Sequence, residues 1–240
     1  MLRIGTSGWS YKHWQGLFYP TDLSQEKWLD YYSQHFDTVE LNSPFYHLPP
    51  KKTFENWYRK TPKDFLFSVK ASRFISHILK LNEAREPLQN LLENASGLQE
   101  KLGPILFQLP PNFSFDPERL EKFAKVLPTD QRFTFEFRHE SWFGDEVYQL
   151  LRKNNLALTI SDTPKYPLVL ETTADFVYVR LHGHEVLYAS KYSPKELEEW
   201  AERIKDWLAD GLDVFVYFDN DANAYAIQNA LELKRLLSLK

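Results

Sequence analysis

Hydrophobic and polar residues alternate along several short stretches of this chain. Within Arg132–Trp142, phenylalanines at 133, 135 and 137 alternate with Thr134, Glu136 and Arg138. Successive side chains of a β-strand point to opposite faces, so the pattern predicts a strand with one aromatic and one polar face. A half-exposed strand has this pattern, and so does a barrel strand whose polar side chains point inward. The alternation recurs at 38–42, 67–70, 107–109 and 177–182, which favours a barrel with one ring of polar groups at its mouth.

Strands and helices are predicted to alternate along the whole chain. The eight predicted strands are Leu2–Thr6, Thr38–Asn42, Phe65–Ala71, Pro104–Leu109, the strand within Arg132–Trp142, Leu156–Ser161, Phe176–His182 and Asp213–Asp219. Seven of the eight segments that follow them have helical character, whereas TPKYPLVLETTAD after the sixth strand has no helical periodicity. Alternation of this kind implies parallel pairing. We therefore predict an α/β fold, a parallel (β/α)8 TIM-type barrel formed by one domain over 1–240, with the helix after strand six reduced or missing.

A doubly wound open sheet is the alternative fold. The central strands of such a sheet are apolar on both faces, whereas one face of the strands predicted in this chain carries charge.

Local sequence signals also predict where several helices begin. Asp116 precedes Pro117 at a predicted N-terminus, and Ser193 and Glu196 have the spacing of a capping box. A short helix is predicted over Asp145–Lys153.

Composition narrows the class of protein. The chain has 240 residues with a net charge of −4 and no cysteine, so disulfides and thiolate metal sites are excluded. A net negative charge argues against a protein dedicated to nucleic-acid binding, although a chain with this net charge can still carry a local basic patch. The N-terminus has no signal-peptide pattern, and no apolar run approaches the length of a membrane span. We expect a soluble, cytoplasmic protein without a membrane partner.

Six motifs together resemble one known family. They are GTSGWSYKHW at the N-terminus, VELNSPFY after the second strand, GPILFQLPPNF at the fourth, FEFRHESW at the fifth, YVRLHG at the seventh and YFDND at the eighth. In combination they are similar to the YecE-like family, also called domain of unknown function 72, over essentially the whole chain. The resemblance implies a TIM-barrel-like fold and no particular reaction, so the function has to be inferred from the site.

The expected catalytic residues lie at the carboxyl ends of the strands, where TIM barrels place their active sites. Two glutamates could divide into general acid and general base, and arginines suit bidentate binding of phosphate or carboxylate. The same charges could instead form structural ion pairs that plug the barrel, although buried ion pairs rarely stabilise more than an apolar filling. The predicted catalytic set is Glu136, Glu40, Arg138, Arg180, His182 and Lys70.

A second set is expected to contact the ligand. Aromatic loop residues can stack on sugar rings or bases, or they can form a small core of their own. Strand-end polar residues would add hydrogen bonds. The predicted substrate-binding set is Ser7, Trp9, Asn42, Tyr46, His77, Gln108, Trp142, Asp162, Tyr188, Tyr192, Asp219 and Asn220.

Three functions remain open from the sequence. We expect an enzyme with an acid/base site, such as a hydrolase, isomerase or lyase, acting on a small sugar-like or base-like ligand that bears phosphate or carboxylate. The alternatives are a metal-dependent phosphoester hydrolase or nuclease, and a non-catalytic anion-binding protein. Histidines at 77, 139 and 182 with Asp162 and Glu136 could form a metal set, but nearby cations would compete with a divalent ion. We therefore predict no metal and no cofactor, and a mouth in which Arg180 binds an anion.

Overall fold

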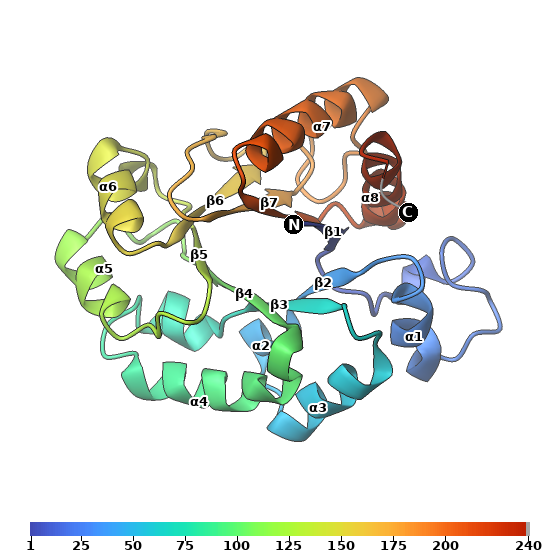
Figure 1. The fold of residues 1–240 in the computed structure, drawn as a ribbon, viewed down its shortest axis with the longest axis horizontal. Coiled ribbons are helices and arrows are strands. Elements are labelled where there is room, and N and C mark those ends of the chain that lie inside the picture. Colours follow the sequence, from blue (N-terminus) through green and yellow to red (C-terminus); the bar gives the residue numbers. More distant parts are fainter. Residues whose placement is uncertain (239–240) are drawn as a thin grey trace.

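The computed structural model describes residues 1–238 and contains an eight-stranded parallel sheet curled into a barrel (Figure 1). The order around the sheet is β1-β8-β7-β6-β5-β4-β3-β2, so each strand neighbours the next in sequence and β1 lies beside β8. The strands are β1 (Leu2–Thr6), β2 (Thr38–Leu41), β3 (Leu66–Lys70), β4 (Leu102–Gln108), β5 (Phe133–Glu136), β6 (Ala157–Asp162), β7 (Phe176–Leu181) and β8 (Asp213–Phe218). The predicted TIM-type barrel is confirmed. The boundaries of the other seven strands lie within two residues of their predicted positions, and β5 lies inside the predicted stretch Arg132–Trp142.

Helices cover the outside of the barrel (Figure 1). They are α1 (Trp28–Tyr32), α2 (Ser43–Tyr46), α3 (Lys51–Lys60), α4 (Arg85–Ala95), α5 (Pro117–Ala124), α6 (Asp145–Lys153), α7 (Pro194–Ala209) and α8 (Tyr225–Leu236). Residues 163–175, between β6 and β7, contain no helix, as the sequence predicts. Both predicted caps are present: Asp116 accepts from the Arg119 amide, and Ser193 and Glu196 form the capping box.

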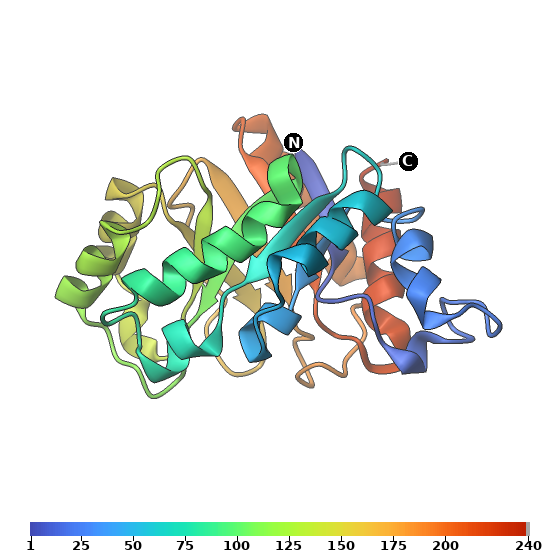
Figure 2. The ribbon, with the colours of Figure 1, turned by 90° about the horizontal axis from the view of Figure 1, so that it is seen from below.

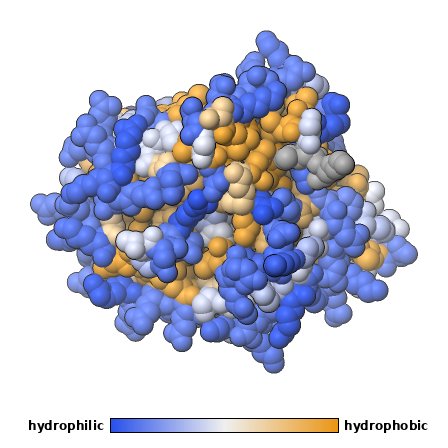
Figure 3. Space-filling model, viewed as in Figure 1, coloured by the Kyte–Doolittle hydropathy of each residue, from blue (hydrophilic) through white to orange (hydrophobic). Residues whose placement is uncertain are grey.

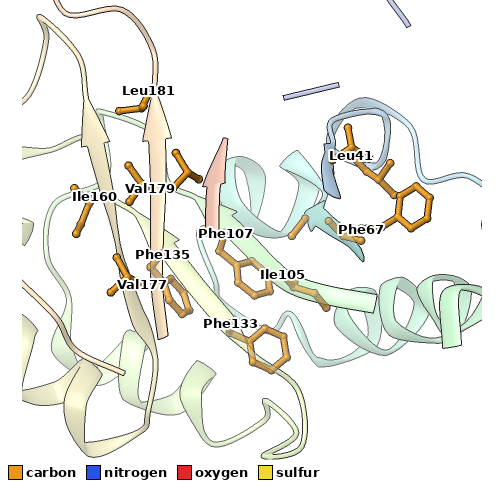
Figure 4. Close-up of a cluster of buried hydrophobic side chains, with 14 of the residues drawn as sticks. Leu41, Phe67, Ile105, Phe107, Phe133, Phe135, Ile160, Val177, Val179 and Leu181 are labelled. Atoms are coloured by element: carbon orange, nitrogen blue, oxygen red, sulfur yellow. The ribbon is translucent and has the colours of Figure 1, made fainter. Parts of the chain in front are cut away.

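The alternation along β5 separates an outer core from the barrel interior. Phe135 packs against Phe107 on β4 and Phe123 on α5, with ring centroids 5.3 and 6.3 Å apart. Phe137 stacks on Trp142 at 4.3 Å. Figure 4 shows this outward layer, which continues through Val177, Val179 and Leu181 of β7. Each buried Phe contributes about 1.5–3 kcal/mol, so the strands and helices are held together mainly by this layer.

Side chains at the alternate positions of the strands point inward and fill the barrel. Near the strand starts, Phe176 and Phe215 pack edge to face with ring centroids 6.0 Å apart. One layer higher, the Tyr217 hydroxyl bonds to Thr38 Oγ1 at 2.7 Å and Ser68 Oγ at 2.8 Å. The interior therefore changes from apolar to hydroxyl-bearing along the barrel axis. The charged side chains described below form the next layer.

The two ends of the barrel differ in the chain segments that lie there. Both termini of the chain lie at the end where the strands begin, at the upper side of Figure 2, and the loops that follow the strands lie at the lower side. Apolar residues gather near the centre of the first end, with hydrophilic residues around them (Figure 3). The candidate site lies at the opposite end, among the loops.

The barrel closes where β1 meets β2. In the described chain this contact is a bridge between Ser7 and Glu40, with the Gly8 amide donating to the Glu40 carbonyl at 2.8 Å. A Cβ atom on Gly5 would lie 2.3 Å from the Thr38 carbonyl oxygen. Glycine is therefore required at residue 5 for the two strands to approach, and their approach brings Ser7 beside Glu40.

Candidate active site

Strands β2, β5 and β7 each direct one long charged side chain into the top of the barrel. Glu40, Glu136 and Arg180 are each at most 1% exposed. The parity that turns Val39, Phe135 and Val179 outward turns these three residues inward. The predicted convergence of strand-end charges is therefore observed.

Arg180 forms the centre of this cluster. Its Nε and Nη2 donate to the two carboxylate oxygens of Glu40, at 3.0 and 2.8 Å. Its Nη1 donates to Glu136 Oε2 at 2.6 Å, and Nη2 also contacts Asp219 Oδ2 at 3.1 Å. The two glutamates predicted to face each other across the barrel thus contact the same guanidinium.

The remaining carboxylate oxygens also have partners. Glu40 Oε1 accepts from Ser7 Oγ, and Glu40 Oε2 accepts from the Tyr178 hydroxyl at 2.7 Å. Glu136 Oε1 accepts from Gln108 Nε2 at 2.8 Å and from Arg138 Nε at 2.9 Å. Burial raises the pKa of Glu136, but the charges of Arg180 and Arg138 outweigh it and hold that pKa well below its usual value. Glu136 is therefore a fixed anion at neutral pH.

His182 and Asp219 complete the cluster on the β7–β8 side. His182 Nδ1 lies 2.9 Å from Asp219 Oδ2, although the ring N–H is not aimed at that oxygen. Burial and Arg180 lower the pKa of His182, but Asp219 and Glu136 outweigh them and the net result is a raised pKa. Burial raises the pKa of Asp219, but Arg180 and His182 bring it down to about 2. Asp219 is therefore ionised throughout the physiological range.

Arg180 has no donor left for a ligand. A guanidinium has five N–H donors, and those of Arg180 meet Ser7, Glu40, Glu136, His182 and Asp219. Anion binding by Arg180 would require one of these contacts to be replaced, and it stays a prediction. Of the two states compatible with the sequence, Arg180 adopts the closed ion-pair network.

Lys70 is the exception among the buried cations. It is 8% exposed, and its ammonium group makes no hydrogen bond and no ion pair with any residue in 1–238. Its Nζ lies 4.4 Å from the centre of the Phe45 ring. Burial, and then the charge of Arg180, lowers the pKa of Lys70 to about 8, although Glu136, Glu40 and Asp219 act in the opposite direction.

Arg138 and His77 lie beside Lys70 at the mouth. Arg138 directs Nε and Nη2 to one oxygen of Glu136, and its side chain keeps 18% of its surface exposed. His77 lies on a π-helical turn, Phe74–Ile78, directly after β3, and its ring meets Phe45 edge to face at 5.2 Å. π-Helical turns occur frequently at functional sites. Burial and the charges of Arg138 and Lys70 lower the pKa of His77 to about 4, so its imidazole is neutral at pH 7.

The predicted ligand-binding residues divide into two groups. Ser7, Gln108 and Asp219 belong to the buried network, and Asn42 donates to Ser7 Oγ at 2.7 Å. Tyr188 meets the His182 ring edge to face at 5.6 Å, and its charge interaction with Arg138 places it at the mouth. Tyr46 is 76% exposed on the short helix α2 after β2.

Other members of that set lie away from the charged cluster, and their role in ligand binding stays a prediction. Trp142 is fully buried in the outer core, where its indole donates to the Phe113 carbonyl at 2.6 Å. The Tyr192 hydroxyl accepts from the Gly183 amide, and Asn220 binds Asn229 under α8. Asp162 is paired with the outward Leu181 and lies near Tyr192 and Trp200. Trp9 packs edge to face on Trp57 of α3 at 5.4 Å. The three aromatic residues among them share one reason: each buries its ring against other aromatic rings, Trp9 on Trp57, Trp142 on Phe137 and Tyr192 on Phe218.

Two residues of the site were not assigned from the sequence. Tyr178 donates to Glu40, and its place two residues before Arg180 on β7 already indicates an inward side chain. Phe45 contacts both Lys70 and His77. No sequence signal separates Phe45 from the core phenylalanines.

Residues 1–238 contain neither a metal-binding cluster nor a membrane-spanning helix. No group of three or more histidine, aspartate or glutamate side chains there is arranged to hold a metal ion. No helix in this range combines the length and apolar character that crossing a membrane requires.

Comparison with known proteins places the chain among uncharacterised relatives. It is 28% identical to the UPF0759 protein YunF of Bacillus subtilis, with 100% of this chain and 96% of the relative aligned. It is 31% identical to the UPF0759 protein YecE of Escherichia coli K12, over 63% of this chain and 54% of the relative.

Solved structures agree with this placement. A DUF72 family protein from Thermotoga maritima superposes with a TM-score of 0.90 at 33% identity, covering 99% of both chains. A DUF72 family protein from Enterococcus faecalis, at 24% identity and a TM-score of 0.87, shares the fold over 100% of this chain and 96% of its own. A family model matches residues 3–240, and the chain belongs to the family described as protein of unknown function DUF72.

Proposed function

We propose that the barrel mouth is an acid/base active site for a small anionic ligand with a sugar-like or base-like ring. Lys70 and Arg138 would bind the phosphate or carboxylate group of the ligand. The observation that carries this proposal is Lys70, a cation 8% exposed with no acidic partner in residues 1–238. Burying a charge without a partner is costly. A bound anion would offset that cost.

Lys70 and His77 would supply the acid and the base. Both contact Phe45, and their pKa values of about 8 and about 4 lie on opposite sides of neutrality. At pH 7 Lys70 is mostly protonated and His77 is neutral, which is the division that acid/base catalysis requires. Glu136 would act through Arg138, since one of its oxygens accepts from Arg138 and its charge is already fixed.

Calorimetric titration with inorganic phosphate at pH 7 tests the binding step. We expect millimolar or tighter binding, weakened at least tenfold in Lys70→Met and in Arg138→Met, which corresponds to about 1.4 kcal/mol. Lys52→Met is the matched control, because Lys52 is an exposed lysine on α3. No binding, or binding that both variants leave unchanged, would overturn the proposal.

The catalytic step needs a separate assay. A panel of phosphorylated and carboxylated sugars and bases should contain a compound that the protein turns over, and turnover should be lost in both Lys70→Met and His77→Asn. Phosphate binding without any turnover would support the non-catalytic alternative and overturn the enzymatic half of the proposal.

A further inference from the structure

We propose that Lys70 forms an imine with a carbonyl carbon of the bound anion, which makes the substrate a 2-oxo acid or a phosphorylated aldehyde or ketone. This inference rests on the proposed function and names the substrate class of the same site. It depends on three features: an amine without a hydrogen-bond partner in residues 1–238, a neutral imidazole against the same Phe45 ring and a second cation for the anionic group.

The surroundings of Lys70 leave its amine free to react. A second buried lysine, Lys101, is 4% exposed and shows the contrast. Its Nζ donates to the Tyr58 and Thr61 carbonyls at 2.6 and 2.8 Å, and also to Thr61 Oγ1 at 3.2 Å. Those acceptors stabilise the ammonium form of Lys101. Among the residues that the structure describes, the Nζ of Lys70 has only the Phe45 ring as a close partner, and an aromatic ring does not occupy the nitrogen lone pair after deprotonation.

Burial is the main cause that favours the neutral amine of Lys70. The positive charge of Arg180 also opposes protonation of Lys70, and together these two effects outweigh the opposite action of Glu136, Glu40 and Asp219. With a pKa of about 8, roughly a tenth of Lys70 is neutral at pH 7, compared with less than about a thousandth of an ordinary lysine. A lysine activated by burial and a neighbouring cation is a recognised nucleophile for carbonyl carbons.

Lys70 and His77 together can account for every proton transfer in imine formation. The Lys70 nitrogen lone pair attacks the carbonyl carbon, and the C=O π electrons move to oxygen. His77, neutral at pH 7, would accept a proton from the nitrogen and pass it to that oxygen, which gives a carbinolamine. A second transfer through His77 would move the remaining N–H proton to the hydroxyl group, which leaves as water while the C=N bond forms. The net change is amine plus carbonyl to imine plus water, with no oxidant or reductant.

Arg138 would select anionic carbonyl compounds over neutral ones. It directs Nε and Nη2 to Glu136 Oε1 and keeps part of its guanidinium exposed at the mouth. A carboxylate or phosphate bound there would lie at the same mouth as Lys70, because Lys70 is the last residue of β3, Arg138 follows the end of β5, and these two strands flank β4. Dihydroxyacetone phosphate should therefore react faster than dihydroxyacetone, which has the same carbonyl group without the anion.

Reductive trapping tests the imine. The full-length protein is incubated with pyruvate or dihydroxyacetone phosphate and sodium cyanoborohydride, and the adduct is located by peptide mass spectrometry. We expect a secondary amine on Lys70, with at least tenfold higher occupancy than on any other lysine. Lys70→Met should abolish this adduct, and the exposed-site control Lys52→Met should leave it unchanged. Arg138→Met should lower the yield at least tenfold with dihydroxyacetone phosphate but not with dihydroxyacetone.

The outcomes separate this inference from the proposed function. Labelling spread over exposed lysines, or no labelling while inorganic phosphate still binds, would overturn the imine and leave the anion site standing. No labelling together with no phosphate binding would overturn both.

Discussion

Arg180 and Glu40 form a two-point ion pair across the barrel, with Nε–Oε2 at 3.0 Å and Nη2–Oε1 at 2.8 Å. The two side chains are 1% and 0% exposed, so neither retains water to offset the loss of its partner. The pair joins β2 to β7, which are not neighbours in the sheet. Its energetic role is therefore asymmetric: forming it gains little over an apolar filling, whereas breaking it is costly.

The first prediction follows for Arg180→Met. This variant leaves Glu40, Glu136 and Asp219 without their shared cation, so the free energy of unfolding should fall by about 3–5 kcal/mol. Urea denaturation at pH 7 measures this change. In the exposed pair on α8, Arg235→Ala removes the partner of Glu232 and should cost far less, because solvent screens exposed ion pairs. A similar small loss for Arg180→Met would mean that the network is not held by this guanidinium.

The second prediction is that Lys70→Met stabilises the protein. At neutral pH Lys70 is charged in both the folded and the unfolded chain, and its folded pKa is lowered from 10.5 to about 8. Protonated Lys70 therefore costs stability, and removing the charge should raise the free energy of unfolding by about 1–3 kcal/mol at pH 7. Such gains accompany residues kept for activity rather than stability.

The increase in the free energy of unfolding that we expect for Lys70→Met should depend on pH. Because the folded pKa is the lower one, the cost is fully present below about pH 8 and disappears as pH rises to about 10.5. The groups that act on Lys70 are Arg180 on β7, Glu136 on β5, Glu40 on β2 and Asp219 after β8. Denaturation of the wild type and Lys70→Met from pH 6 to 10 should therefore show converging stabilities. A constant difference across that range would contradict the lowered pKa.

The sequence predicted which faces of the strands are charged but not how the charges pair. Side-chain parity is local, so the outward Phe135 and the inward Glu136 follow from alternation alone. The partners of Arg180 depend instead on the relative heights of β2, β5 and β7 in the closed barrel. Those heights come from strand tilt and from the seam at Gly5, which a local pattern does not encode.

The loop residues were the least predictable part of the site. Trp142 and Tyr46 are both aromatic and both follow strands, yet Trp142 is fully buried and Tyr46 is 76% exposed. The difference is whether a neighbouring element offers an apolar surface within reach: Trp142 finds Phe137 at 4.3 Å. Whether an aromatic loop residue is buried or exposed therefore depends on tertiary packing, and the position of Phe45 under Lys70 does too.

The third prediction concerns acid stability. Asp219 has its pKa lowered from 3.8 to about 2, so it contributes stability that is fully present above about pH 4. That contribution, about 2 kcal/mol, is lost as pH falls from about 4 to about 2. Asp219→Asn should be less stable by this amount at pH 7 and should lose less stability between pH 4 and 2. Parallel acid profiles for the two proteins would show that Asp219 is not ion-paired in solution.

The last prediction concerns the barrel seam. Alanine at residue 5 would place its Cβ 2.3 Å from the Thr38 carbonyl oxygen, a contact that backbone atoms relieve only by moving apart. Separating β1 from β2 would break the bridge between Ser7 and Glu40 and with it the support that Ser7 Oγ gives the carboxylate. Gly5→Ala should therefore cost at least about 3 kcal/mol or prevent folding. Gly144→Ala is the matched control: its Cβ meets no atom within 4 Å and its backbone is extended, so the change should stay within about 1 kcal/mol. If thermal denaturation showed equal losses for both variants, close approach at residue 5 would not be what sets the seam.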